Sequence, residues 1–194
     1  MNFTIRKLTP ELAEDYAAFF DATPHYENKD EDKCYCVTWR GDDSYVGDDH
    51  WYPTREERRE RAVQFVKDGY LRGYLAYSGD RIVGWCNATA DCSKGVDFMR
   101  SYWPIEERTD GVRVKSIFCY VVAPDAQRMG VATLLTERVC EDAIEEGFDY
   151  VEAYANLTHD ALDFRGPLAM FEKCGFHKCA ERDGRVVVRK ALKN

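Results

Sequence analysis

The sequence predicts a single α/β domain built around a mixed sheet. Two strand patterns, Tyr74–Tyr77 and Arg81–Thr89, are separated only by Ser78-Gly79-Asp80, which is typical of an antiparallel hairpin. Further along, the apolar or aromatic run Ile117–Ala123 is long enough for a strand buried on both faces, and apolar residues at helical spacing follow it. Hairpins join antiparallel strands and helical crossovers join parallel ones, so we expect both pairings in one sheet.

The first part of the chain predicts one strand, two helices and a long connection between the helices. Phe3–Leu8 alternates like a half-buried strand, and Pro10–Phe20 follows as a helix. Thr54-Arg-Glu-Glu57 is a capping box, and it opens a charged helix that ends at Gly69. The connecting segment Asp21–Tyr52 is irregular, and loops of this length are usually functional or mobile.

The later part predicts strands that alternate with helices. A strand from Val114 leads into a helix that reaches Glu146, and the strand Tyr150–Ala155 comes next. After a loop, a short helix ends at Cys174, and two final strands pair across Asp183-Gly184. Because the chain shows no internal repeat and no low-complexity segment, we expect residues 1–194 to form one domain.

Composition and charge exclude several classes of protein. The formal net charge is −8, from 27 basic and 35 acidic residues, and an acidic surface repels phosphate backbones. We therefore expect no nucleic-acid partner, while a cationic amine would be mildly favoured. No apolar stretch approaches the ~20 residues that span a bilayer, and the first residues alternate like a strand instead of resembling a signal peptide. The expected location is the cytoplasm, without a membrane partner.

The eight cysteines show no metal-binding pattern. They form no paired C-x-x-C knuckles, and the four histidines are not at H-x-x-x-H spacing, so we expect no metal. Cys34-Tyr-Cys36 differs from the rest because it lies in a polar stretch ahead of Trp39. This pair fits a redox or metal-sensing role, and it fits a packing or substrate-wall role as well.

The segment that follows the buried strand predicts an anion site. Pro124 cannot continue the strand ladder, and a helix begins in the turn Gln127–Gly130. The first amides of that helix have no partner inside it, and they lie at the positive end of the helix dipole. Gly130 and Ala132 lack the large side chains that would keep a diphosphate away from this backbone. An ordinary strand-to-helix turn, with glycine present for geometry alone, would show the same spacing.

Three motifs carry a resemblance to a known family. Gln127-Arg-Met-Gly130-Val-Ala132 resembles the Q/R-x-x-G-x-G/A acyl-CoA loop of the GNAT superfamily of N-acetyltransferases, and Val122-Ala-Pro124 resembles the end of that family's fourth strand. Met170-Phe-Glu-Lys-Cys-Gly-Phe176 resembles the family's Y-E-K-x-G-F helix end. Cys34-Tyr-Cys36-Val-Thr-Trp39 is similar to a poorly characterised bacterial subgroup of GNAT-like proteins. The resemblance is good over residues 70–190 and weaker over Phe3–Phe20.

The resemblance implies a fold, a reaction and a cofactor site. The fold would be a mixed, mostly antiparallel sheet of about six to seven strands with helices on both faces and a splay between the fourth and fifth strands. The reaction would transfer an acetyl group from acetyl-CoA, without a metal, to a primary amine of a small molecule or peptide by direct attack in a ternary complex. The backbone of the buried strand would pair with the pantetheine arm, with the Tyr120 amide near the thioester oxygen, and the amides of the following loop would hold the diphosphate. The cofactor-binding residues that the resemblance implies are Tyr120, Val121, Val122, Gln127, Arg128, Met129, Gly130, Val131, Ala132, Thr133 and Phe171.

The acid and base positions depart from the family. Where some members carry a glutamate general base this chain has Ser116, and where members often carry a tyrosine general acid it has Phe171. Glu152 and Tyr154 share one face of the adjacent strand and are the substitutes, although a half-buried strand facing solvent would show the same alternation. The predicted catalytic residues are therefore Tyr154, Glu152 and Ser116, with the roles of acid and base left open.

The acceptor side would be formed by two loops. Asn156–Arg165 departs from the family and contains His159 beside Asp160, a pair that fits either a base or surface decoration. The aromatic and acidic residues of Asp21–Tyr52 would suit an amine or an aromatic cation, or they form a solvated loop over the sheet edge. The sequence does not determine the oligomeric state and leaves a homodimer open.

Three functions remain at this stage. The first is the N-acetyltransferase. The second is a non-catalytic acyl-CoA-binding module, which the missing tyrosine and glutamate permit. The third is a thiol-redox or metal sensor that uses Cys34 and Cys36.

Overall fold

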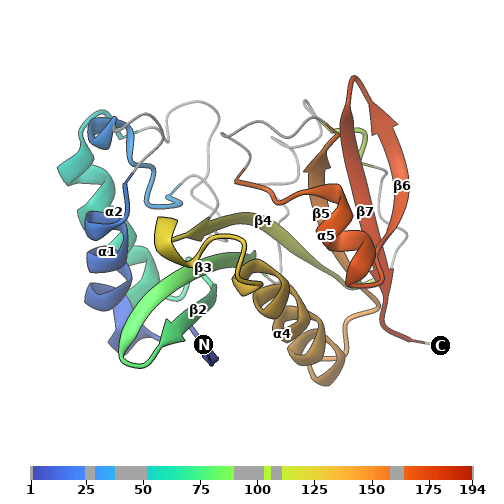
Figure 1. Ribbon diagram of the computed structural model, residues 1–194, viewed down its shortest axis with the longest axis horizontal. Helices are drawn as coiled ribbons and strands as arrows, with labels where there is room; N and C mark the ends of the chain where they lie inside the picture. Colours follow the sequence, from blue (N-terminus) through green and yellow to red (C-terminus); the bar gives the residue numbers. More distant parts are fainter. Residues whose placement is uncertain are drawn as a thin grey trace.

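One seven-stranded sheet runs through the part of the chain that the structure describes (Figure 1). The structure is a computed structural model, and it describes residues 2–24, 29–37, 52–89, 103–105, 111–157 and 164–193. The strand order is β1-β2-β3-β4-β5-β7-β6, and every neighbouring pair is antiparallel except the parallel pair β4 and β5. The expected mixed, mostly antiparallel sheet is confirmed. The strands are β1 (Phe3–Lys7), β2 (Gly73–Ser78), β3 (Arg81–Thr89), β4 (Val114–Val122), β5 (Tyr150–Asn156), β6 (His177–Arg182) and β7 (Arg185–Ala191).

Helices cover both faces of this sheet. Neighbouring residues of β3 demonstrate this, because successive side chains of a strand point to opposite faces. The Trp85 ring packs against Tyr16 of α1, whereas a Cβ at Gly84 would meet Val131 and Leu135 of α4. The helices are α1 (Ala13–Ala22), α2 (Arg55–Lys67), α4 (Val131–Glu145) and α5 (Leu168–Lys173), with 3₁₀ turns η1 (Pro10–Leu12), η3 (Asp30–Asp32) and η5 (Pro124–Ala126).

The segments with local sequence signals form the predicted helices and strands, with small shifts at their ends. The capping box of α2 is present: the Glu57 amide donates to Thr54 Oγ1, and the Thr54 amide donates to Glu57 Oε2, both at 3.2 Å. The expected helix from Pro10 begins as the 3₁₀ turn η1 and becomes α1 only at Ala13. The first strand ends one residue early, although the Leu8 amide still donates to the Gly73 carbonyl.

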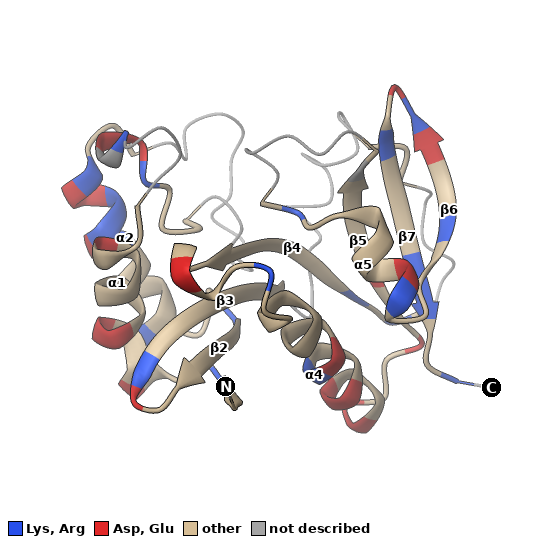
Figure 2. Ribbon diagram, viewed as in Figure 1, with Lys and Arg blue, Asp and Glu red and all other residues tan. Residues whose placement is uncertain are grey.

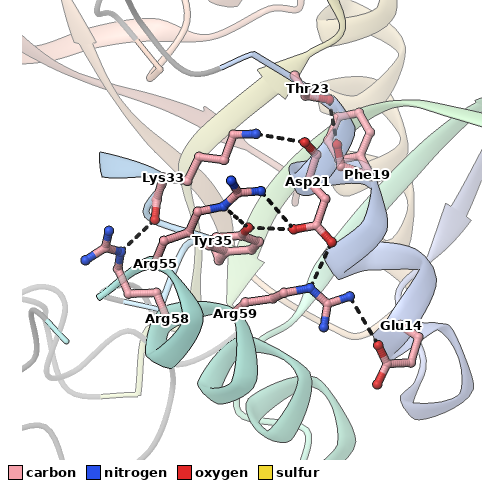
Figure 3. A network of polar contacts seen from close by, with 9 residues as sticks. All are labelled: Glu14, Phe19, Asp21, Thr23, Lys33, Tyr35, Arg55, Arg58 and Arg59. Carbon is pink, nitrogen blue, oxygen red and sulfur yellow. Dashed lines mark hydrogen bonds and ion pairs between the residues drawn. The ribbon is translucent and has the colours of Figure 1, made fainter. Parts of the chain in front are cut away.

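A polar network joins α1 and α2 to the described part of the segment between them (Figure 3). Arg58 is 1% exposed, and its guanidinium donates to the carbonyls of Glu31, Lys33 and Tyr52. Three backbone carbonyls are satisfied by one buried cation in this way, so both described stretches of the segment are fixed to α2.

Asp21 forms the other half of this network. Its carboxylate accepts from the Tyr35 hydroxyl at 2.6 Å and from Arg59 Nε at 2.8 Å, and it pairs with Arg55. Partial burial by itself raises the pKa of Asp21, but the Tyr35 hydrogen bond and the two arginines outweigh burial and lower that pKa. The ionised carboxylate therefore joins α1, α2 and the segment between them.

The parallel strands separate part-way along their length. Pairing between β4 and β5 runs from Val114 opposite Tyr150 to Ile117 opposite Ala153, and then it stops. Both strands continue, β4 as the partner of β3 and β5 as the partner of β7. The expected splay is confirmed, and it exposes one edge of β4 from about Phe118 onward to groups other than β5.

Candidate active site

The exposed edge of β4 presents backbone groups toward the splay. The Ala123 amide donates to the Val83 carbonyl of β3. Because the backbone N–H and C=O groups of successive strand residues point to opposite edges, the backbone of Val121 also faces β3. The backbones of Tyr120 and Val122 consequently face the opening. Their groups are engaged within the chain: the Tyr120 amide donates to the Phe164 carbonyl at 2.5 Å, and the Val122 carbonyl accepts from the Gln127 side chain at 3.3 Å.

The side chain of Tyr120 lies on the α4 face of the sheet. Its hydroxyl is 2.7 Å from Thr136 Oγ1, and its ring packs 6.2 Å from the ring of Phe171. Burial raises the pKa of Tyr120 well above its usual range, so this phenol is neutral at physiological pH. Phe171 is completely buried and also packs against Phe176. The residue at the family's tyrosine position is thus part of the apolar core in this structure.

The turn before α4 leaves the helix without a side-chain cap. Arg128 and Gly130 both have positive φ, at 59° and 87°. The first helical hydrogen bond recorded runs from the Leu134 amide to the Gly130 carbonyl, so the preceding helical amides have no partner inside the helix. Neither an acidic residue nor a capping side chain lies in the first turn of α4, and Figure 2 shows its acidic residues toward the other end.

The space around Gly130 is open. A Cβ built on Gly130 would meet nothing within 4 Å, and residues 127–130 are exposed. The structure therefore places most predicted loop residues around one uncapped helix start, where a phosphate can approach the backbone. The residues Gln127, Arg128, Met129, Gly130, Val131, Ala132 and Thr133 form this turn and the first residues of α4.

The predicted acid–base residues form a buried polar cluster across three strands. The Tyr154 hydroxyl lies 2.7 Å from Glu152 Oε1 and 3.1 Å from Ser116 Oγ. Ser116 stands opposite Glu152 in the parallel register. Arg189 of β7, which the sequence did not suggest, donates from Nε to Glu152 Oε2 at 2.5 Å. Ser116, Glu152 and Tyr154 are all completely buried.

This cluster lies on the face opposite the α4 helix. Lys115 reaches Glu146 at the end of α4, and its neighbour Ser116 must point to the other face. Aromatic rings cover Tyr154: Phe118 is stacked at 5.6 Å, and Trp103 lies at 6.5 Å with its Nε1 donating to the Ala155 carbonyl. The cluster and the anion site therefore lie on opposite faces of the sheet, and the splay separates them.

The Cys34–Cys36 pair is linked to the buried strand. Cys36 Sγ lies 3.1 Å from Cys119 Sγ of β4, and Trp85 Nε1 donates to Cys36 at 3.3 Å. The contact with Cys119 raises the pKa of Cys36, and the contact with Cys36 raises that of Cys34. A raised pKa disfavours the reactive thiolate. No cluster of three metal-ligating residues occurs within the described residues.

Several predicted features lie outside the described residues or away from the site. His159 and Asp160 fall outside the described ranges, as do the aromatic and acidic residues of the segment between Val37 and Tyr52. A groove of about 580 Å³ lies between α1, the β2–β3 turn and η5, and neither the acid–base cluster nor the α4 turn lines it. The contact from Phe164 was not predicted, because a backbone carbonyl leaves no signature in residue type.

The comparison with protein families decides the classification. The sequence model of the family described as the acetyltransferase (GNAT) family matches residues 5–176. The chain belongs to the GNAT acetyltransferase family. The resemblance that the three motifs carried is confirmed, and with it an acyltransferase fold over nearly the whole chain.

Solved GNAT structures share this fold at low identity. A GNAT-family acetyltransferase from Streptococcus pneumoniae has 17% identity and a TM-score of 0.53, over 99% of this chain and 100% of that chain. Salmonella typhimurium yncA, solved with its cofactor acetyl-CoA, has 13% identity and a TM-score of 0.54, over 98% and 94%. The ribosomal-protein-S5-alanine acetyltransferase from Vibrio fischeri has 12% identity and a TM-score of 0.57, over 100% and 95%. A search of curated proteins gave no match.

Proposed function

We propose that this GNAT-family chain transfers an acetyl group from acetyl-CoA to a primary amine of a small molecule or peptide by direct attack in a ternary complex. The observation that carries the proposal is the β4–β5 splay with the uncapped start of α4 beside it. The acetyl-CoA bound to the Salmonella protein supports the donor. The activity named for the Vibrio protein, on an alanine of ribosomal protein S5, supports a peptide amine as acceptor.

The described residues fit the donor. The amides after Gly130 would hold the diphosphate, because they are unpartnered within the helix and no side chain intrudes. The backbones of Tyr120 and Val122 would pair with the amides of the pantetheine arm, as an added strand does. The Tyr120 amide would donate to the thioester oxygen where negative charge develops. For this to happen, the Phe164 carbonyl must leave that amide.

Proton transfer would fall to the cluster on the other face. The amine attacks as a neutral nucleophile and loses one proton as the new C–N bond forms and the C–S bond breaks. Ser116, at the position of the family base, is the member of the cluster on β4, and Tyr154 links its hydroxyl to the Glu152 carboxylate. The carboxylate that the family carries on the fourth strand would here act from the fifth.

Thermal stability in the presence of acetyl-CoA tests the donor first. At 100 times its dissociation constant, acetyl-CoA should add about 2.7 kcal/mol, which corresponds to roughly 5 to 10 °C in Tm. S-acetylpantetheine, which lacks the diphosphate nucleotide, should give a much smaller shift at the same concentration. An amine and peptide library would then be screened for release of free CoA thiol. No shift with millimolar acetyl-CoA would contradict the proposal.

A non-catalytic acyl-CoA-binding module is the second candidate. Two observations favour it: the Tyr120 amide is already bonded to Phe164, and the acid–base cluster is completely buried. It predicts the same thermal shift with acetyl-CoA but no amine-dependent release of thiol. Retention of the acetyl group throughout the amine screen would favour this module over the enzyme.

A further inference from the structure

A row of polar residues crosses four strands at the acid–base cluster. The strand registers place Ser116 opposite Glu152, Glu152 opposite Arg189, and Arg189 opposite His177. Residues in register point to the same face of a sheet, so the row runs from the splay at β4 to the edge strand β6. The contacts from Ser116 through Tyr154 and Glu152 to Arg189 follow this row.

The hydrogen bonds in the row connect Ser116 to Glu152 through Tyr154. A phenol carries one proton, and the Tyr154 hydroxyl can donate it to Glu152 Oε1 at 2.7 Å or to Ser116 Oγ at 3.1 Å. Arginine has no acceptor, so Arg189 donates to the other carboxylate oxygen. A proton that enters at Ser116 has a hydrogen-bonded route to that carboxylate.

Arg189 is what permits a charge at Glu152. The Glu152 side chain is 1% exposed, and a buried carboxylate is costly unless it is paired. Its surroundings are Ser116 from β4, Tyr154 from its own strand and Arg189 from β7, with His177 of β6 beyond Arg189. Arg189 is a cation in direct contact with this carboxylate. The Arg189 side chain is 23% exposed, so the row meets solvent at this residue.

We propose that Arg189 is a positioning residue for acetyl transfer, which keeps Glu152 ionised and directed at Tyr154. This inference rests on the proposed function. The acceptor amine gives its proton to Ser116 Oγ as the Ser116 proton passes to Tyr154 and the Tyr154 proton passes to Glu152. The acyl C–S bond breaks as the C–N bond forms, and the CoA thiolate takes its proton from solvent. Glu152 then releases its proton to solvent on the Arg189 side, and the row returns to its starting state.

Substitution of Arg189 separates this role from a merely structural one. In Arg189→Gln, kcat should fall by about tenfold or more, while KM for acetyl-CoA stays unchanged because α4 and the Tyr120 edge are untouched. Arg189→Lys keeps the charge and should restore most of kcat. Lys178→Gln, on β6 with its exposed ion pair to Glu181, is the matched control and should leave kcat and KM unchanged.

Infrared spectroscopy tests the charge without turnover. Arg189→Gln at neutral pH should show the C=O band of a protonated carboxyl that is absent from wild type and that disappears in the double variant with Glu152→Gln. Absence of this band would overturn the proposal, even if no amine is ever acetylated. A wild type that releases no CoA would contradict the proposed function instead.

Ser116→Ala covers the case in which the Arg189 variants do not fold. It keeps the Glu152–Arg189 pair and removes only the entry to the row, so kcat should fall as in Arg189→Gln. An unchanged kcat in Ser116→Ala would overturn the proposal.

Discussion

At the scale of single residues, the carboxylate of the candidate acid–base cluster lies on β5 and not on β4. The family position for a glutamate base on β4 holds Ser116, and the register places Glu152 of β5 directly opposite it. The Tyr154 hydroxyl lies within hydrogen-bond distance of the Ser116 hydroxyl and of the Glu152 carboxylate, and aromatic rings cover the cluster. A carboxylate is therefore still present at this place in the fold, on the neighbouring strand.

Tyr154→Phe tests the link between Ser116 and Glu152. The ring and its stacking on Phe118 remain, but the hydroxyl is lost, so kcat for amine acetylation should fall by about 10²-fold. Loss of the buried hydrogen bonds should also cost about 1 to 3 kcal/mol in the free energy of unfolding, measured with urea.

Tyr16→Phe is the matched control for Tyr154→Phe. Tyr16 is also completely buried, and its hydroxyl donates to the Tyr35 carbonyl at 2.8 Å. This variant should lose a similar free energy of unfolding with kcat unchanged. Equal kcat in the two variants would show that Tyr154 acts only in packing.

Gly130→Ala tests the anion site. At φ 87° an alanine is strained by about 1 to 2 kcal/mol, yet its Cβ meets no atom within 4 Å, so the variant should fold. The methyl group would stand where the diphosphate approaches, and the dissociation constant for acetyl-CoA should rise at least about tenfold, a loss of about 1.4 kcal/mol of binding free energy.

Gly184→Ala is the control for strain alone. Gly184 lies in the turn between β6 and β7 with φ 75°, and a Cβ there also meets nothing within 4 Å. Its variant should lose comparable stability and bind acetyl-CoA as tightly as wild type, by calorimetry. Equal affinities in the two variants would contradict the placement of the diphosphate at Gly130.

At the scale of elements, the segment before α5 closes the edge of β4. Its backbone meets Tyr120 at the hydrogen bond from the Tyr120 amide to the Phe164 carbonyl. Gly166 follows with φ 85°, and its α-carbon lies so close to Met170 and Tyr120 that a Cβ would be 3.0 and 3.3 Å from them. Pantetheine pairing at Tyr120 therefore requires this segment to move.

Hydrogen exchange with and without acetyl-CoA tests that movement. Amides of residues 164–166 should exchange faster when acetyl-CoA is bound, because their packing on β4 is displaced. The Tyr120 amide should stay protected, since one acceptor replaces another. Amides of α2 serve as the internal reference and should not change. Slower exchange across residues 164–166 would show that acetyl-CoA binds without displacing the segment.

Local sequence patterns predicted most helices and strands, but they did not predict the contacts between these elements. The buried strand, the capping box at Thr54 and the uncapped turn at Gly130 are read from neighbouring residues, and the structure has all of them. The contact between Arg189 and Glu152 depends on the register of β5 and β7, which the valine run of β7 does not determine. The family resemblance predicted only the general position of an acid and a base, and that assignment stays a prediction.

At the scale of the whole molecule, the two candidate sites lie on opposite faces of the sheet. The α4 face carries the candidate anion site and the Tyr120 side chain, whereas Ser116 points to the face of α1 and α2. Under the proposed function the splay would be the passage between them, where an acyl group held on one side would meet an amine on the other. Among the described residues no helix is long and apolar enough to cross a membrane.

Two carboxylates fasten the helices to these faces and should make folding sensitive to acid. Glu146, at the end of α4, contacts Lys7 of β1 and Lys115 of β4, both at 2.6 Å. Partial burial raises its pKa, but the two lysines outweigh burial and lower it. On the other face, the pKa of Asp21 is lowered by Tyr35 and the arginines of α2. Each ionised carboxylate is therefore favoured in the folded state.

The sign of the pH effect follows from these lowered pKa values. A group whose pKa is lower in the folded state stabilises fully above its unfolded value, here near 4.5 for Glu146 and 3.8 for Asp21, and loses that contribution as pH falls through the folded value. Urea midpoints of the wild type should thus fall steeply below about pH 4.5. Glu146→Gln and Asp21→Asn should each lower the midpoint at pH 7 and flatten that fall. Glu141→Gln, an exposed site on the same helix as Glu146, should change neither, and a wild-type slope in both test variants would place the acid sensitivity elsewhere.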